Sequence, residues 1–383
     1  MRYDYIISGA GCAGLSLLMR LMASGKFSDK KILLVDRDLK PRNDRTWCFW
    51  EKENGLFEEI VYKQWSDLYF FGEGYEGLLE IDPYRYKMVR GLDFYNHCLK
   101  LVQRNPNVDL KEGKIESLHS SSKGVYIRID GNNYEGNYIF NSILFDDPRQ
   151  LRQDNKYYFL KQHFRGWFIE TEHPAFDPGK ATLMDFRPSQ AHGTTFTYVL
   201  PFSETKALIE YTLFTKDLLK PEEYDEALKS YIETYVTKEK YTIRETEFGV
   251  IPMTNYPFVP FEGNIINIGT AGGQTKPSSG YTFQFIQKYT QKVVETLIAT
   301  GKPFVNPENS SRFSFYDSTL LQVLDKKKIE GKKLFTDLFR HGDVQTVLKF
   351  LDNETSFRED INIMRRLPKG KFAMAALKEI FKV

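Results

Sequence analysis

The sequence predicts an α/β fold with three parts: a parallel strand–helix–strand domain, an antiparallel β-sheet and a helical C-terminal region. Three patterns in the 383 residues support this prediction. An apolar run, a glycine-rich turn and a helical repeat follow one another within residues 5–22. Alternating runs broken by prolines fill residues 156–215, as is typical of antiparallel strands. Residues 300–383 are basic and have the apolar spacing of helices.

The glycine-rich turn near the N-terminus has the spacing of a dinucleotide-binding site. Gly9, Ala10, Gly11 and Gly14 stand between the apolar run and the helix. Gly9 permits the tight turn, Gly11 lets the phosphates approach the backbone, and Gly14 lets the helix pack on the strand. Asp36 ends the second apolar run, where a carboxylate accepts ribose hydroxyls. Because the N–H groups of a helix N-terminus attract anions, we expect this turn to hold a pyrophosphate.

Composition argues against several classes of protein. The net charge is +2, so the chain lacks the basic field that attracts nucleic acid. The three cysteines are odd in number and have no metal spacing, which favours a reducing cytoplasm over a disulfide framework. The six histidines lie far apart, so we expect no metal site. We expect neither a secretory signal nor a membrane span, because the chain opens on a strand and no apolar run approaches ~18 residues.

Residues 41–50 are interpreted as a loop that brings Arg45, Trp47 and Trp50 together. Loops with such side chains often line binding sites. Arg45 either contacts a bound cofactor or its phosphates, or pairs with Asp44. The tryptophans either line a pocket or pack on one another. The aromatic content of 15% leaves the same choice between large cores and an aromatic pocket.

The middle of the chain alternates between helices and short strands. Apolar residues at helical spacing predict helices over 91–104 and 221–236, the second with Pro221 in its first turn. Gly131 and Asn132 mark a hairpin turn. The expected strands are 108–119, 124–130, 134–139, 139–145, 156–172, 181–187, 194–200, 206–215 and 241–253.

A second strand–glycine loop–helix unit lies late in the chain. Residues 264–270 are predicted to form a strand ending in Gly269, a loop runs to Gly280, and a helix is expected over 281–299. A nicotinamide domain built in one piece does not need such a unit. FAD is longer, and its ribityl and isoalloxazine end needs its own loop and helix N-terminus. We therefore expect FAD, bound by a Rossmann-like domain of the glutathione-reductase/hydroxylase type.

These patterns divide the chain into three domains, of which the first is discontinuous. The expected ranges are 1–66, 91–155 and 255–300 for the FAD-binding domain, 67–90 and 156–254 for a substrate domain with the antiparallel sheet, and 301–383 for the helical region. In that last region, the amphipathic run 333–351 and the basic tail 365–381 either dock on the core or lie in a membrane interface.

Several longer motifs accompany the two glycine loops. They are DRTWCFW at 44–50, QHFRGWFIE at 162–170, MDFR at 184–187, TYVLPF at 197–202, ALIEYT at 207–212, GVIPMT at 249–254 and KPSSGY at 276–281. With this set the chain resembles the bacterial lycopene cyclases of the flavoprotein type, from its N-terminal turn to about residue 325. Flavoproteins of the wider superfamily usually end the late strand in Gly-Asp. Here Thr270 follows Gly269, as suits the cyclases, so the side chain that holds the ribityl group stays open.

The resemblance implies an enzyme that cyclises the linear ψ ends of lycopene to β-ionone rings, through γ-carotene to β-carotene, without net electron transfer. Reduced FAD is the implied cofactor, and NADPH is the expected electron source. Because lycopene dissolves only in bilayers, we expect peripheral binding at the cytoplasmic side of a membrane. An FAD-dependent monooxygenase or an isoprenoid-chain reductase of the same fold is the alternative.

Glu210 matches the acidic residue of the family's essential motif and is the expected catalytic carboxyl. It lies in an apolar strand, and burial would raise its pKa and keep it protonated. Whether Glu210 or the reduced flavin donates the proton stays open, as do the number of ends cyclised, a β or ε ring, and the oligomeric state. The expected cofactor contacts are Gly9, Ala10, Gly11, Gly14, Asp36, Arg45, Gly269, Thr270 and Gly280, and the expected substrate contacts are Trp47, Trp50 and Tyr211.

Overall fold

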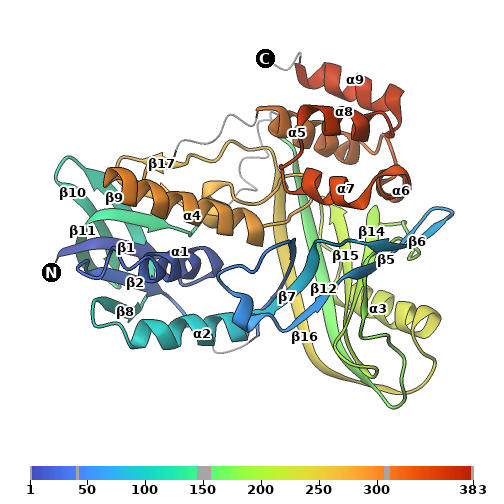
Figure 1. Ribbon diagram of the computed structural model, residues 1–383, viewed down its shortest axis with the longest axis horizontal. Helices are drawn as coiled ribbons and strands as arrows, with labels where there is room; N and C mark the ends of the chain where they lie inside the picture. The colour runs from blue at the N-terminus through green and yellow to red at the C-terminus, as the bar shows by residue number, and fades with distance from the viewer. Residues whose placement is uncertain (1, 40–42, 145–156, 306–310, 381–383) are drawn as a thin grey trace.

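The computed structural model describes residues 2–39, 43–144, 157–305 and 311–380. It contains two large β-sheets, a small third sheet and a group of helices at the C-terminal end (Figure 1). The first sheet is built around parallel strands, and the second is mostly antiparallel. The predicted α/β fold class is therefore confirmed.

The first sheet has eight strands in the order β17–β18–β11–β1–β2–β8, and β10 and β9 branch from β11. The neighbours from β18 to β8 run parallel. The bounds of the eight strands are β1 (Arg2–Ser8), β2 (Ile32–Asp36), β8 (Val108–Glu112), β9 (Ile115–Ser121), β10 (Gly124–Ile129), β11 (Asn132–Asn141), β17 (Phe261–Glu262) and β18 (Ile265–Asn267). The late strand is thus shorter than the predicted 264–270, and a 3-10 turn, η3 (Gly269–Gly272), follows it.

The apolar run of β1 is covered on both sides, as expected for the centre of a parallel sheet. Ile7 lies in one apolar cluster with side chains of α1 (Cys12–Ala23), α2 (Gly91–Gln103) and α4 (Phe283–Thr300). Ile6 lies in another cluster with side chains of the β9–β10 hairpin. Because α1 and α4 pack together, the first and the late glycine loops lead into neighbouring helices.

The second sheet has the order β16–β12–β15–β14–β13–β5–β6. All of its pairings are antiparallel except β13–β5, which is parallel and joins an early hairpin to the later strands. The helix α3 (Pro221–Tyr235) covers one face, and side chains of the C-terminal helices pack on the other. The strand bounds are β5 (Asp67–Gly72), β6 (Tyr75–Glu80), β12 (Phe159–Thr171), β13 (Lys180–Asp185), β14 (Thr194–Pro201), β15 (Lys206–Thr215) and β16 (Tyr241–Thr254).

The third sheet corrects the prediction of a loop over 41–50. Within that range, Thr46 to Trp50 belong to strand β3 (Thr46–Glu51), which pairs with β7 (Arg85–Arg90). β7 also pairs with β4 (Lys63–Trp65), and the short η1 (Glu58–Ile60) precedes β4. The sequence pattern missed this strand because its partner lies almost forty residues later, and pairing of that kind is a tertiary effect.

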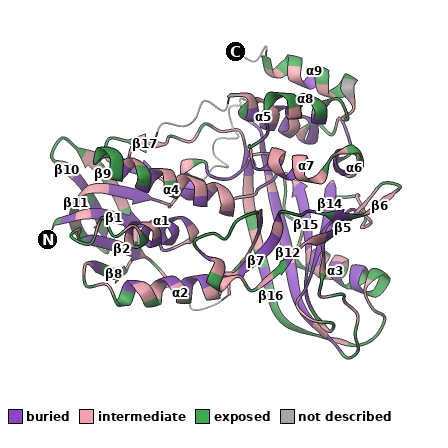
Figure 2. Cartoon of the chain, in the orientation of Figure 1, coloured by how far each residue is buried: buried purple, intermediate pink, exposed green. Residues whose placement is uncertain are grey.

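The C-terminal region is helical, as predicted. Its helices are α5 (Ser311–Asp325), α6 (Gly331–His341), α7 (Val344–Leu351), α8 (Phe357–Met364) and α9 (Lys369–Ile380). The amphipathic run predicted over 333–351 is two helices, because Asp343 caps the start of α7 by accepting a hydrogen bond from the backbone N–H of Thr346 at 2.9 Å. Figure 2 shows buried residues along β12, β14 and β15 and exposed residues on the outer side of α9. No helix within the described ranges is long and apolar enough to cross a membrane.

Candidate active site

The N-terminal turn has the backbone geometry that its glycines predict. Gly9 has a φ of +103°, and a Cβ there would overlap the Ser142 hydroxyl. A Cβ on Gly14 would overlap the carbonyl oxygen of Gly9, so close packing of α1 on the strand requires glycine at this position. A Cβ on Gly11 would meet nothing within 4 Å. The backbone at Gly11 is therefore open to an incoming group.

Asp36 lies at the end of β2 and is bonded to this turn. Its Oδ2 accepts a hydrogen bond from the Ala10 N–H at 2.7 Å, and its Oδ1 accepts one from the Asp38 N–H at 3.2 Å. The Ala10 N–H is thus directed at Asp36. A carboxylate has about four acceptor positions, so two stay available for ribose hydroxyls. The first turn of α1 has no acidic residue and no side-chain cap, which suits an anion.

The late glycine loop lies against the first. Gly269 has a φ of +65°, and a Cβ there would lie 2.8 Å from the Cβ of Ala13 in α1. Gly280 has a φ of +73°, and a Cβ there would overlap Gln162 Oε1. Side chains at either position would push these segments apart. The structure therefore brings together two loops that are far apart in the sequence.

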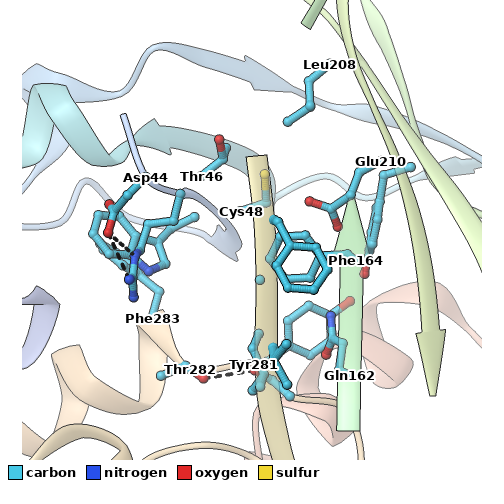
Figure 3. Close-up of a pocket in the computed structure, with 18 of the residues that line it drawn as sticks. Asp44, Thr46, Cys48, Gln162, Phe164, Leu208, Glu210, Tyr281, Thr282 and Phe283 are labelled. Atoms are coloured by element: carbon cyan, nitrogen blue, oxygen red, sulfur yellow. Dashed lines mark hydrogen bonds and ion pairs between the residues drawn. The ribbon is translucent and has the colours of Figure 1, made fainter. Parts of the chain in front are cut away.

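A cavity of about 350 Å³ lies where the late glycine loop meets the second and third sheets. Its volume is within the range of small-molecule sites. Figure 3 shows Gln162, Phe164 and Glu210 on one side of it and Thr282 and Phe283 at the start of α4. Of the predicted site residues, the lining includes Arg45, Trp47, Glu210, Thr270 and Gly280.

Glu210 projects from β15 into this cavity (Figure 3). Protein surrounds its carboxyl, although the side chain is partly accessible from the cavity. Its Oε1 accepts a hydrogen bond from the Thr212 hydroxyl at 2.9 Å. Burial, followed by the charge of Glu247 and a hydrogen bond with that residue, raises the pKa of Glu210 well above the ordinary value, against the opposing effect of Thr212. The carboxyl therefore keeps its proton to a higher pH than an ordinary glutamate does.

Glu247 is a part of the site that the sequence analysis did not identify. It lies on β16 and is 4% exposed. The Thr46 hydroxyl donates a hydrogen bond to its Oε2 at 2.8 Å. The pKa of Glu247 is raised, chiefly by burial. Hydrogen bonds from Thr46 and with Glu210 oppose this rise, and the charges of Asp44 and Glu245 add to it. The segment RETEF has no apolar setting that would have marked this residue as buried.

Aromatic and other uncharged side chains lie near Glu210 in the cavity wall, which also includes the ion pair of Asp44 and Arg45. Phe164 lies on β12, Tyr198 on β14, and Tyr86 on β7. Burial raises the pKa of Tyr86, of Tyr198 and of the Cys48 thiol. These groups are consequently neutral over the physiological range.

Both alternatives for Arg45 are compatible with its position. Its Nη2 lies 2.9 Å from Asp44 Oδ2, and the same side chain lines the cavity. Trp47 also lines the cavity and packs edge-on against Phe94, with the ring centroids 5.1 Å apart. The ion pair thus leaves Arg45 at the site.

Two of the predicted substrate contacts lie outside the cavity lining. Trp50 is 2% exposed and packs edge-on on Tyr281, with the centroids 4.8 Å apart. Tyr211 belongs to the apolar cluster under α3, on the face of the sheet opposite Glu210. Successive side chains of a strand point to opposite faces, so Glu210 and Tyr211 cannot face the same cavity. Phe164 and Tyr198 line the cavity, whereas Trp50 and Tyr211 do not.

The described residues include no group of three or more His, Cys, Asp or Glu side chains that could hold a metal ion. Arg187 forms an ion pair with the buried Asp185, and its Nε lies 2.9 Å from both carboxylate oxygens. The Tyr231 hydroxyl donates a further hydrogen bond to Asp185 at 2.6 Å. This pair does not line the cavity and joins β13 to α3.

A buried polar atom without a hydrogen-bond partner among the described residues offers one test of whether a flavin fits the cavity. Gln162 Oε1 is buried and has no hydrogen-bond partner among the described residues. It lies at Gly280 on the cavity wall. A ligand that donates a hydrogen bond would satisfy this acceptor. The open backbone at Gly11 and the position of Asp36 fit the other end of a dinucleotide.

Comparison with solved structures identifies flavoproteins with this fold. A flavoprotein/dehydrogenase from Cytophaga hutchinsonii matches with a TM-score of 0.65 and 12% identity, covering 99% of this chain and 100% of that one. A geranylgeranyl bacteriochlorophyll reductase-like protein from Thermoplasma acidophilum matches with a TM-score of 0.59 and 14% identity, covering 100% and 99%. The p-nitrophenol 4-monooxygenase PnpA from Pseudomonas putida matches with a TM-score of 0.59 and 13% identity, covering 99% and 98%. At these identities the likeness concerns the fold alone.

Sequence comparison is more specific. Curated protein sequences give no significant match. The family model described as lycopene cyclase protein matches residues 4–377, which is nearly the whole chain. The match agrees with the motifs at 44–50 and 207–212, which lie at the cavity. The chain belongs to the lycopene cyclase family.

Proposed function

We propose that this chain is a lycopene β-cyclase, which converts the linear ψ end groups of lycopene to β-ionone rings, through γ-carotene to β-carotene. The observation that carries the proposal is Glu210, a buried carboxyl with a raised pKa at the wall of an aromatic cavity. Membership of the family supports the reaction type. Glu210 is the proposed catalytic acid.

The chemistry requires a protonated acid in a site that excludes water. Ring closure begins when a proton is added to an isolated C=C bond, which leaves a tertiary carbocation. A carboxyl with an ordinary pKa would be ionised at neutral pH and could not supply that proton. The neighbouring double bond then closes the ring, and a carboxylate removes one proton from it. One proton enters and one leaves, so the product is an isomer of the substrate.

The cavity walls suit a cationic intermediate. The rings of Phe164, Tyr198 and Trp47 present electron-rich faces, which attract cations within about 6 Å. The neutral phenol of Tyr198 adds no competing anion. A site that excludes water would also prevent water from trapping the cation as an alcohol.

FAD is the proposed cofactor, and the two glycine loops fit its two ends. Asp36 and the turn at Gly9 to Gly14 would hold the adenosine and the pyrophosphate, and the loop from Gly269 to Gly280 would hold the flavin end. Reduced FAD supplies negative charge beside the cation when it is bound, and NADPH is the proposed source of its electrons. Gln162 is the proposed acceptor for a flavin N–H.

Lycopene reaches the enzyme from a bilayer, so we propose peripheral binding at the cytoplasmic side of a membrane. Exposed apolar side chains of α8 and α9 support this assignment. Phe357 is 60% exposed, Met374 58%, Leu377 54% and Ile380 54%. Lys371 and Lys378 lie on the same helix as the last three and are exposed. Apolar and cationic side chains in this combination favour an anionic membrane surface.

An anaerobic assay tests the function directly. Full-length protein with FAD is reduced by NADPH or dithionite and incubated with lycopene in liposomes, and the products are separated by chromatography. We expect γ-carotene and β-carotene, both of the mass of lycopene, at a rate that oxygen does not increase.

Two results would contradict the cyclase proposal. A product that gains oxygen and forms only in air would identify a monooxygenase. A product that gains hydrogen, with one NADPH consumed per turnover, would identify an isoprenoid-chain reductase. The number of ends cyclised and the type of ring follow from the same chromatogram.

A further inference from the structure

Glu210, Gly166 and Glu247 lie directly opposite one another on three neighbouring strands of the second sheet. β12 is the middle strand, with β15 on one side and β16 on the other. Gly166 pairs with Glu210 on β15 and with Glu247 on β16. Residues paired in this way across antiparallel strands point to the same face of the sheet. The two glutamates therefore share a face, with only a glycine between them.

The absence of a side chain at Gly166 lets Glu247 reach across the middle strand. A Cβ at Gly166 would lie 2.9 Å from Glu247 Cγ, 3.2 Å from Glu247 Oε1 and 2.9 Å from Leu208 Cδ1. Glu247 thus occupies the space above Gly166 and extends toward β15. Any larger residue at this position would separate the two carboxyls.

The oxygen atoms of Glu247 have different surroundings. Oε2 accepts the hydrogen bond from Thr46 at 2.8 Å, which fixes the side chain. Oε1 is buried and has no donor among the described residues, apart from a proton carried by a neighbouring carboxyl. A buried acceptor without a donor costs about 1–3 kcal/mol, so a proton between the two glutamates would remove this cost.

We propose that Glu210 and Glu247 share one proton across Gly166, with Glu247 acting as the positioning residue that holds the proton on Glu210. The proposal deepens the function proposed above and rests on it only for the identity of the substrate. Glu247 does not line the cavity, so it acts through Glu210. Two carboxyls in such contact cannot both ionise at neutral pH without strong repulsion.

The groups that face the pair favour this assignment. They are Asp44, Cys48 on β3, Glu245 on β16 and Tyr198 on β14, all acidic or neutral. The one cation among the described residues that line the cavity, Arg45, is paired with Asp44. Burial raises the pKa of both carboxyls, and the charge of Glu247 raises that of Glu210 further. Of the two carboxyls only Glu210 lines the cavity, so we place the shared proton on Glu210 and take Glu247 as its anionic partner.

The pair also accounts for return of the proton. When Glu210 protonates a C=C bond of the substrate, both carboxyls become anionic, and their repulsion raises the affinity for a proton. The carbocation then loses one proton to the pair, which restores the starting state. One C–H bond forms and one breaks, and no electrons are exchanged.

Infrared spectroscopy of the FAD-loaded protein tests the pair without lycopene. The C=O stretch of a protonated carboxyl is followed against pH, and the band that disappears in Glu210→Gln is assigned to Glu210. We expect that band to persist at pH 7 in the wild type. In Glu247→Gln its titration midpoint falls by about one pH unit or more, because a neutral partner no longer repels the Glu210 anion. In Glu247→Asp we expect the titration midpoint of the Glu210 band to stay close to the wild-type value.

Glu226→Gln is the matched control, since Glu226 is an exposed glutamate on α3. We expect its midpoint to equal that of the wild type. In the cyclisation assay, the alkaline limb of the pH–rate profile moves to lower pH in Glu247→Gln but not in Glu226→Gln.

Two results would overturn the shared proton: no Glu210 band at pH 7 in the wild type, or the same midpoint in Glu247→Gln and the wild type. Because the first of these measurements uses the wild type, it tests the shared proton even if Glu247→Gln fails to fold. A wild type that has the band but does not cyclise lycopene would refute the proposed substrate and leave the pair intact.

Discussion

Replacing Glu210 by glutamine is expected to change activity and stability in opposite directions. Glutamine has the shape of the protonated carboxyl and keeps an acceptor for the Thr212 hydroxyl. Its N–H group can donate to Glu247 Oε1 in place of the shared proton. It cannot supply a proton, so we expect the cyclisation rate to fall at least 10²- to 10⁴-fold, the usual contribution of a general acid, while FAD stays bound.

The stability effect follows from the raised pKa of Glu210. The folded protein keeps a proton that the unfolded chain releases near pH 4.5, the ordinary value of this carboxyl. Stability is therefore lost as pH rises from that value to the folded pKa, by about 1.4 kcal/mol for each unit of separation. Glutamine removes this loss. The variant should equal the wild type below pH 4 and unfold at a higher temperature at pH 8.

Thermal unfolding from pH 4 to pH 9, together with the anaerobic lycopene assay, checks both effects. Glu226→Gln, an exposed glutamate on α3, is the control and should change neither quantity. A Glu210→Gln enzyme with the wild-type rate would place the acid elsewhere. A variant that is less stable than the wild type at pH 8 would refute the argument that Glu210 is buried in its protonated form.

Three further predictions concern other parts of the molecule. Gly269→Ala should reduce the amount of retained FAD, because the new Cβ would press on α1; flavin absorbance per protein measures this. The control is Gly25→Ala, which has the same φ of +65° but open space around the new Cβ, and it should retain FAD. Leu377→Glu should reduce flotation with anionic liposomes at low salt, and a wild type that stays at the bottom would contradict membrane binding. Burial raises the pKa of Asp352 from 3.8 to about 6, so stability is lost as pH rises between these values. Asp352→Asn should therefore stabilise the protein at pH 8 by up to about 3 kcal/mol but not at pH 3.5, as thermal unfolding would show.

The sequence by itself determined the parts of the fold and site that depend on local patterns. The turn at Gly9 to Gly14, the acid Asp36 and the late loop at Gly269 were all recognisable, because glycine spacing and apolar runs reflect the conformation of a few adjacent residues. Glu210 stood out as a carboxyl within an apolar strand. The resemblance to the cyclases then gave that residue a role.

Only the tertiary structure decided which side chains meet at the cavity. It made Thr46 to Trp50 part of a strand by pairing it with β7, and it directed Tyr211 away from Glu210 through the alternation of β15. It also set Glu247 opposite Gly166 and so beside Glu210, although these residues are dispersed along the sequence. The register between strands depends on how whole sheets pack, and a shift of one residue would turn each of these side chains to the other face.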